Sequence, residues 1–590
     1  MRSRAWCGTI AFIAAQPALV VAYALQGSIK EIATIYAITT VAALIPLWVA
    51  ERKAGPRAAI PLTVAAAAAV GVVGPAAGVW LAPLLIVAFA AALRLRGARA
   101  WRPLMGALGV FAVIGFVLSW QSIHSLTRYV DVAGAVVTAQ NESGNLLGPL
   151  HAIQMFGIWL SGDYRLPPTS MLDDTYVLIG VALLGALFGL LWLVRRRALA
   201  VGLYVAVSLL AWWYVTDRGS PWADGKALTI VSPAVVLVAL LGGRSLVESG
   251  RRIEGAGVVA LVGLGVLASN ALAYHDVALA PHGRLEELAS VGERLKGTGP
   301  TLYPEFEEFG KHFLRDDQPE GPSEVWHARP VAGSASQAGG PRFGVSTELD
   351  QLALPYIEQF RSIVLRRGFA GSRPPANFRA IWHGRWYEIW QRTPRPRVLD
   401  HVVLGVPRAP AAVPKCRELR ALGRRASEHG GKLALSPLET PPLMAPGKSR
   451  HSPSWVVDGS DALTLVPVGP GEVHGRLTVP RAGRYDAWLE GSFERGITVL
   501  VDGRPVGKVS NALNARGDAE PVATLTLSAG THAITLLRGG GNLAPGNGID
   551  PRVGPLALMR AGESRPVVTV APRDAARWCG RSLDWMEIVA

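Results

Sequence analysis

A few charged and aromatic residues next to apolar segments have the side chains that a group-transfer reaction needs. The catalytic candidates are carboxylates that could accept a proton from an acceptor hydroxyl, namely Glu31, Asp224 and Asp217. The substrate-binding candidates are cations suited to phosphate oxygens and one indole suited to a sugar ring, namely Lys30, Arg218, Lys226 and Trp222. For 217–226, a solvated loop with an interfacial tryptophan anchor is the simpler interpretation.

Long apolar stretches must position these residues. A helix needs about 20 mostly apolar residues to cross a bilayer, because its backbone groups must be satisfied within the segment. The first 275 residues predict about nine such spans, at 5–25, 32–50, 58–73, 76–93, 104–120, 175–194, 198–216, 228–242 and 255–274. The third and fourth are separated only by Gly74 and Pro75, which predicts a tight hairpin.

Basic residues alternate along the connections between these spans. One set of connections holds fifteen lysines and arginines, including Arg52 and the 195–197 run, and the opposite set holds five. Short cytoplasmic loops retain Lys and Arg. We therefore predict a multi-pass plasma-membrane protein with a cytoplasmic N-terminus, and with residues from 276 onward outside the cytoplasm. The first apolar stretch is too long for a usual signal peptide.

The composition excludes a nucleic-acid-binding function. The chain has 590 residues, of which 50% are hydrophobic and only 17% charged, and its formal net charge is +15. Fifteen basic residues are explained by topology, and the others form no nucleic-acid-binding signature. Contact with the anionic headgroups of the lipid bilayer, or with a cell-wall polymer, is the simpler explanation of this charge.

Residues 276–400 predict an extracytoplasmic α/β domain. An apolar face indicates a helix over Arg284–Lys296, and Pro304 followed by acidic residues predicts a second helix over Glu305–Leu314. Phe378–Trp382 and Arg385–Gln391 predict a hairpin whose aromatic residues belong to the core.

The last part of the chain predicts a β-sandwich. Residues 401–454 are rich in Pro, Arg and Gly and predict a linker with one short helix near Arg417–Arg424. Short strands then recur at near-regular spacing within 455–590, at Glu472–Val479, Tyr485–Glu490, Ile497–Val501, Val522–Leu527 and His532–Leu537. The final Trp585–Val589 is expected to close a sheet edge.

Two cysteines, Cys416 and Cys579, lie in the part predicted to be outside. Thiols in an oxidising compartment pair, so a Cys416–Cys579 disulfide is expected, with two unrelated buried thiols as the alternative. No cofactor is certain. A divalent cation is left open by the oxygen-bearing side chains of Asn542–Asp550, while no metal-ligating or nucleotide-binding motif is found in its required context.

Three segments of the sandwich are similar to jelly-roll modules that often bind carbohydrate. They are Ala482–Trp488, Val499–Gly503 and Leu527–Ile534, within about 120 residues. This resemblance implies a jelly-roll fold. It assigns no sugar-contacting residue, because the aromatics that contact sugar vary in position among such modules.

The whole arrangement resembles actinobacterial-type membrane glycosyltransferases of the GT-C superfamily, and Thr301–Gly310 and Gly384–Arg392 are similar to segments of such proteins. The resemblance implies a polyprenyl-phosphate sugar donor, an envelope glycan acceptor and catalytic carboxylates in a long first external loop. Here that loop is only Gln26–Glu31 and has one acid. Three interpretations stay open: the chain corresponds to the later helices of a longer enzyme, with a second membrane chain as an open partner; or it is a non-catalytic relative; or the resemblance is one of architecture only.

Two functions therefore remain open: a GT-C-like glycosyltransferase, catalytic or degenerate, and a membrane-anchored carbohydrate-binding or scaffold protein. An enzyme predicts an acid-containing pocket where external loops meet the helices. A scaffold predicts glycan binding by the exterior part alone. An ion-coupled transporter is disfavoured because the spans hold almost no ionisable residues.

Overall fold

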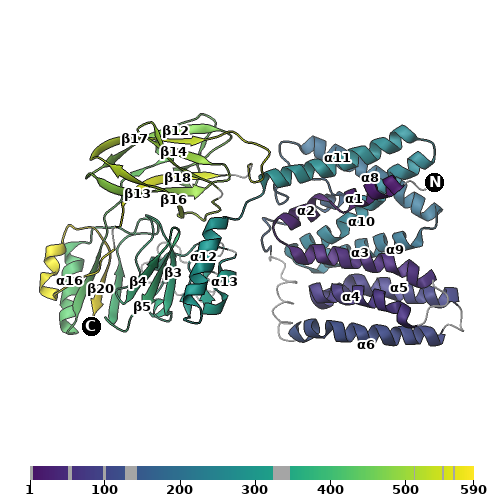
Figure 1. The fold of residues 1–590 in the computed structure, drawn as a ribbon, viewed down its shortest axis with the longest axis horizontal. Helices are drawn as coiled ribbons and strands as arrows, with labels where there is room; N and C mark the ends of the chain where they lie inside the picture. Colours follow the sequence, from purple (N-terminus) through teal and green to yellow (C-terminus); the bar gives the residue numbers. More distant parts are fainter. Residues whose placement is uncertain are drawn as a thin grey trace. The chain divides into compact units, whose positions relative to one another are not determined.

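The computed structural model describes residues 4–50, 56–96, 101–126, 143–307, 309–322, 346–510, 512–547, 551–562 and 565–590. The chain divides into two compact units, Met1–Val277 and Ala278–Ala590. The first is helical, and the second contains sheets with a few helices (Figure 1).

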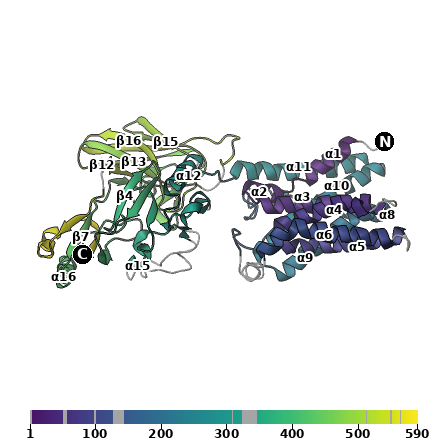
Figure 2. The same cartoon turned by 60° about the horizontal axis from the view of Figure 1, so that its bottom comes forward.

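The first unit is a helical bundle whose long helices run alongside one another (Figure 2). Seven helical segments of the described chain are long and apolar enough to span a membrane, and there are eight if a bent pair near the N-terminus counts as one span. The helices are α1 (Arg4–Ala14), α2 (Ala18–Leu25), α3 (Ile29–Ala50), α4 (Ile60–Val73), α5 (Gly78–Arg96), α6 (Trp101–Leu126), α8 (Leu172–Arg195), α9 (Leu199–Arg218), α10 (Pro221–Glu248) and α11 (Arg252–Asp276).

The helix count differs from the predicted nine at two places. The expected straight span 5–25 is two helices that meet at 57°, because Pro17 cannot donate the backbone bond that would continue α1. The predicted spans 58–73 and 76–93 form one apolar stretch of 40 residues. Gly74 interrupts it with a φ of +64°, which favours glycine.

Helix α10 is the most buried of the spanning helices. It packs backbone to backbone against α8, since a Cβ atom added at Gly242 would lie 1.8 Å from the carbonyl oxygen of Gly185. The outer faces of the bundle carry exposed apolar side chains, among them Tyr36, Val113, Leu184 and Leu264. A lipid bilayer would cover such a surface.

The second unit begins with helix α12 (His282–Leu295), which packs on a five-stranded sheet. The predicted helix over 284–296 and the predicted hairpin are confirmed. The predicted helix over 305–314 is wrong: only α13 (Gly310–Phe313) forms, because Glu305 is drawn into buried bonds with Tyr303 and Tyr387. The strand order is β2 (Pro319–Glu320), β1 (Thr301–Leu302), β3 (Ser362–Arg366), β5 (Tyr387–Arg392), β4 (Phe378–His383).

A second sheet of four antiparallel strands takes one strand and part of another from the predicted linker 401–454. The order is β19 (Val568–Val570), β7 (Lys432–Pro437), β20 (Leu583–Val589), β6 (Val398–Val403), and helix α16 (Cys416–Glu428) covers one face. The prediction of a linker over 401–454 is therefore wrong. The final strand β20 pairs with β6 and β7 rather than with the sandwich. Strand β7 is buried on both faces, so its residues do not alternate between buried and exposed. The sequence therefore contains no alternating pattern from which to predict this strand.

The remaining strands form the predicted β-sandwich, whose two sheets enclose one apolar core. One sheet has the order β10 (Val456–Asp458), β11 (Asp461–Val466), β18 (Arg552–Arg560), β13 (Gly483–Ser492), β16 (Ala519–Leu527). The other has the order β15 (Arg504–Val509), β14 (Ile497–Val501), β17 (Gly530–Arg538), β12 (Gly471–Val479), β9 (Arg450–His451). Each of the five strands predicted here is present.

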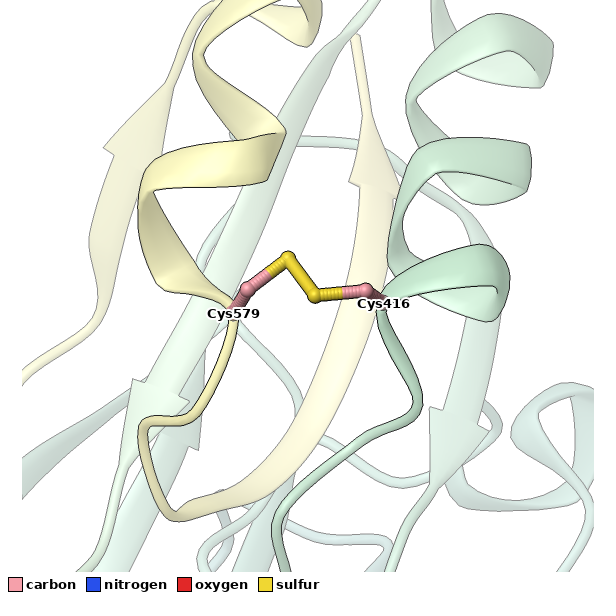
Figure 3. Close-up of a disulfide and its surroundings, with 2 residues drawn as sticks. All are labelled: Cys416 and Cys579. Atoms are coloured by element: carbon pink, nitrogen blue, oxygen red, sulfur yellow. A yellow bond between two sulfur atoms is a disulfide. The ribbon is translucent and has the colours of Figure 1, made fainter.

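Cys416 and Cys579 form a disulfide, with their Cα atoms 5.3 Å apart (Figure 3). The bond joins the start of α16 to the end of the 3-10 helix Pro572–Trp578. It therefore links elements beside the four-stranded sheet.

Candidate functional site

The second unit contains a cleft of about 910 Å³ between its five-stranded sheet and the sandwich. One wall comes from β3, β4, β5 and the segment 367–376, and the other comes from β13 and the loops at 517–519 and 559–565. Residues 346–349 border the same space. Pockets that bind drug-sized ligands have volumes of about 300–1,000 Å³, so the cleft is large enough for an oligosaccharide.

A buried ionic network holds the two walls together. Arg284 is ion-paired with Glu305, and its Nη2 atom donates to the carbonyl of Leu513 at 2.7 Å. Arg366 at the end of β3 donates to Glu520 of the sandwich at 2.6 Å. Burial raises the pKa of Glu305, but Arg284 and Arg366 outweigh it, so the pKa is lowered and the carboxylate stays charged.

The segment 367–376 is fixed by charged side chains that bond its backbone. Asp584 accepts from the Ser372 hydroxyl at 2.6 Å and from the Arg373 amide at 2.8 Å. Arg373 donates to the carbonyls of Pro374 and Phe378, and Arg565 donates to the carbonyl of Gly368. The floor of the cleft is thus defined by many polar contacts.

Two acidic residues beside the cleft have perturbed acidity. Burial, together with the charges of Asp350 and Asp518, raises the pKa of Glu348 to about 8. Burial and the charge of Glu305 raise the pKa of Asp518 to about 7. Both carboxyl groups hold a proton for much of the time at neutral pH, so each can donate a hydrogen bond to a hydroxyl oxygen.

The predicted site in the first unit contains a close contact between opposite charges. Lys226 Nζ lies 2.6 Å from Glu31 Oε1, and Glu31 is buried. The same ammonium lies 3.8 Å from the centre of the Trp222 ring. A Cβ atom at Gly144 would lie 2.3 Å from that indole, so the chain at Gly144 also packs on it. The ring therefore contacts both Lys226 and Gly144 and is half-buried.

The other predicted residues are separate from that contact. Asp224 accepts from Trp212 Nε1 at 3.1 Å and from the Thr216 hydroxyl at 2.6 Å, bonds that tie α9 to the first turn of α10. Asp217 and Arg218 are exposed and lie 3.7 Å apart. Lys30 is exposed at the first turn of α3. The structure brings Glu31, Lys226 and Trp222 together, and their role in binding or catalysis stays a prediction.

Polar side chains extend the neighbourhood of Glu31 along the same end of the bundle. Gln26 Oε1 accepts from Asn145 Nδ2 and from the Tyr164 hydroxyl, each at 2.9 Å. Arg165 pairs with Asp163 at 2.7 Å. The loop after residue 143 therefore folds onto the end of α2. Residues 127–142, which precede this loop, lie outside the described residues.

No group of three or more His, Cys, Asp or Glu able to hold a metal occurs in the described part of the chain. In the loop considered for a divalent cation, Asn547 Nδ2 donates to Asn542 Oδ1 at 2.6 Å. Residues 548–550 of that loop lie outside the described residues, so the cation stays untested.

The cleft was missed from the sequence. Its charged residues lie at separate positions such as 348, 366–373, 518 and 565, which no local spacing relates. The one available signal was the density of arginine between 361 and 397, in a segment otherwise rich in strand-forming residues.

No protein-family model matches the chain, and no curated protein matches it. Similar solved structures include a GH26-CBM35 β-(1,4)-mannanase from Podospora anserina, with 12% identity, 22% of this chain and 29% of that chain covered, and a TM-score of 0.17. An exo-β-1,3-galactanase from Phanerochaete chrysosporium has 17% identity, with 20% and 29% covered and a TM-score of 0.16. A family 35 carbohydrate-binding module from Clostridium thermocellum has 13% identity, with 22% and 98% covered and a TM-score of 0.15.

The chain thus spans less than a third of the two enzymes it matches, and nearly all of the isolated module. TM-scores this low carry no argument about function. The sandwich is assigned by its own strand pairing and core, and the site by its own geometry.

Proposed function

We propose that this chain is a multi-pass membrane protein of the cell envelope that binds a carbohydrate in the cleft of its second unit. The observation that carries the proposal is the cleft itself, whose size suits an oligosaccharide and whose walls carry many hydrogen-bonding side chains. Apolar helices of spanning length support the membrane anchor. The alternation of basic loops supports an extracytoplasmic second unit.

Filling the cleft tests this proposal. A Cβ atom at Gly371 meets no atom within 4 Å, so Gly371→Trp should occupy the cleft without disturbing the fold. We expect the full chain in lipid nanodiscs to bind envelope polysaccharide fragments, and Gly371→Trp to weaken binding at least tenfold, as measured by calorimetry.

The matched control is Gly540→Trp, since the Cβ of Gly540 also meets open space and this residue lies outside the cleft. Equal binding by wild type and Gly371→Trp would place any glycan site elsewhere.

Transfer from a polyprenyl-phosphate sugar is the second candidate function, and one observation favours it. Glu31 and Lys226 are an ion pair at one end of the apolar bundle, with Glu31 buried, and buried ionisable groups of such bundles are costly and commonly functional. In this proposal Glu31 accepts the proton of the acceptor hydroxyl, and Lys226 balances the phosphate of the leaving lipid.

We expect Glu31→Gln to reduce transfer by about 100-fold or more in proteoliposomes supplied with polyprenyl-phosphate sugar, the usual scale for losing a general base. Glu248→Gln, another ion-paired glutamate of the bundle, is the control and should keep full transfer. A Glu31→Gln/Lys226→Gln variant removes the unpaired lysine that the single change leaves behind. If the double variant transfers sugar as well as wild type, Glu31 is only structural.

A further inference from the structure

Arginine is the dominant charged residue of the cleft. Seven arginines line it, against five carboxylic acids. Three of the arginines, Arg379, Arg395 and Arg560, are exposed at its edge. Arginine presents a planar set of donors that matches the two oxygens of a carboxylate or phosphate.

Most of these arginines have no acidic partner among the residues that the structure describes. Within the described ranges, no carboxylate oxygen lies within 4.0 Å of a guanidinium nitrogen of Arg367, Arg373, Arg379, Arg395, Arg560 or Arg565, whereas Arg366 is paired with Glu520. Arg373 and Arg565 use their donors on backbone carbonyls, so neither forms a direct ion pair with a described residue, although Asp584 and Glu388 act on both at longer range.

The acids of the cleft do not cancel this charge. Glu305 is already shared between Arg284 and Arg366. Asp486 accepts from the neutral hydroxyl of Thr524 at 2.6 Å, and Glu388 lies 3.4 Å from His383, so these two acids offset only part of the charge of seven arginines. The raised pKa values of Glu348 and Asp518 reduce their negative charge at neutral pH.

The tryptophans of the cleft do not offer an open face to a neutral sugar. Trp488 and Trp390 are only 3% and 4% exposed. The guanidinium of Arg367 lies 5.5 Å from the ring centre of Trp488, and that of Arg373 lies 4.8 Å from the ring of Trp390. Cations thus cover the indoles, and recognition through ring stacking is disfavoured relative to recognition through charge.

We propose that the ligand of the cleft is an anionic glycan, with a uronate carboxylate or a sugar phosphate held by Arg379, Arg395 and Arg560 at the edge of the positively charged floor. This rests on the proposed carbohydrate-binding function and names its ligand class. Screening of exposed charges implies that affinity falls as salt rises.

The experiment uses the full chain in phosphatidylcholine nanodiscs, which carry no net lipid charge. The probes are tetragalacturonate and its methyl ester, which share a sugar backbone but differ in charge, and phosphomannan with its dephosphorylated form. The variant is Arg379→Gln/Arg395→Gln/Arg560→Gln. The matched control is Arg476→Gln/Arg481→Gln/Arg504→Gln, three exposed arginines of the sandwich outside the cleft.

We expect at least one anionic probe to bind ten times or more tighter than its neutral partner, and the cleft variant but not the control to lose that difference. Binding of tetragalacturonate alone assigns uronate, and binding of phosphomannan alone assigns phosphate. Equal binding of charged and neutral partners overturns this inference and leaves the proposed function standing. If none of the four probes binds, this inference is overturned. The proposed function is still supported in that case if wild type, but not Gly371→Trp, retains other envelope polysaccharide. Preference for anions that survives the triple change places the site outside the cleft and overturns the inference.

Discussion

At the scale of single residues, the second unit buries acids whose protonation depends on folding. Asp350 is 6% exposed, and burial together with the charge of Asp584 raises its pKa to about 7. His401, beside Glu587 at 2.6 Å, has a pKa raised by that carboxylate despite its burial. Charged groups of several elements, including Arg565, therefore meet around one small region.

The raised pKa of Asp350 predicts that the second unit loses stability as pH rises. The folded state holds a proton that the unfolded state, with an aspartate pKa near 3.8, releases earlier. The stabilisation that Asp350 contributes is therefore fully present below about pH 4. It is lost as pH rises through about 7, at up to about 1.4 kcal/mol per pH unit. His401 acts in the same direction, because its folded pKa is also raised.

Asp350→Asn removes the charge while keeping the shape. The Tm of the variant should therefore decrease less than the Tm of wild type when the pH is raised from 5 to 8. Thermal unfolding of the full chain in detergent measures this, with Asp316→Asn as an exposed control. Parallel pH dependence of wild type and Asp350→Asn would mean that Asp350 is not the group responsible.

Residue chemistry was the weakest part of what the sequence could predict. Glu31 and Lys226 were singled out from their types and do pair. Asp217 and Arg218 were chosen for the same reason and are a solvated pair. Residues such as Glu348 and Asp518 gave no signal, because their acidity depends on burial by elements far away in the chain.

At the scale of elements, periodicity worked where one face of a strand or helix is buried. The alternation in β12 and β17 predicted both strands, and the apolar face of α12 predicted that helix. It failed at Glu305, where a tertiary network overrides the preference of a proline and acidic residues for a helix start. It also failed at β7, which is buried on both faces. Pro17 was present in the sequence, but the bend that it introduces was not predicted.

The Cys416–Cys579 disulfide makes an element-scale prediction. It closes a loop with a sequence separation of 163 residues, and long loops lose the most chain entropy on cross-linking. Reduction should lower the stability of the second unit by about 2–5 kcal/mol, the usual cost of losing such a bond. Cys416→Ser/Cys579→Ser should show the same loss and no further response to reductant in thermal unfolding. A Tm unchanged by both treatments would show that α16 and its neighbours are held by packing alone.

At the scale of the whole molecule, the location of the second unit depends on the order of crossings. The bent pair α1 and α2 either crosses the bilayer or re-enters the same side, and this decides the side of residues near 28. From the arginines before α6 onward, five helices of the described chain are candidate spans, namely α6, α8, α9, α10 and α11. If each of these helices crosses the bilayer and the basic loop before α6 is cytoplasmic, as we propose, residue 277 lies outside whatever the N-terminal pair does.

Cysteine labelling tests this order of crossings. In a Cys7→Ala background, an impermeant maleimide should label Ser28→Cys in intact cells but should reach Ser249→Cys, at the end of α10, only after lysis. An alkaline phosphatase fused after residue 300 should be active, since that enzyme needs the oxidising exterior in which the disulfide would also form. If Ser28→Cys is labelled only after lysis while the fusion is still active, α1 and α2 are a re-entrant pair. The loop after α3, which carries Arg52, would then lie outside. An inactive fusion would place the cleft in the cytosol, where an envelope glycan cannot reach it.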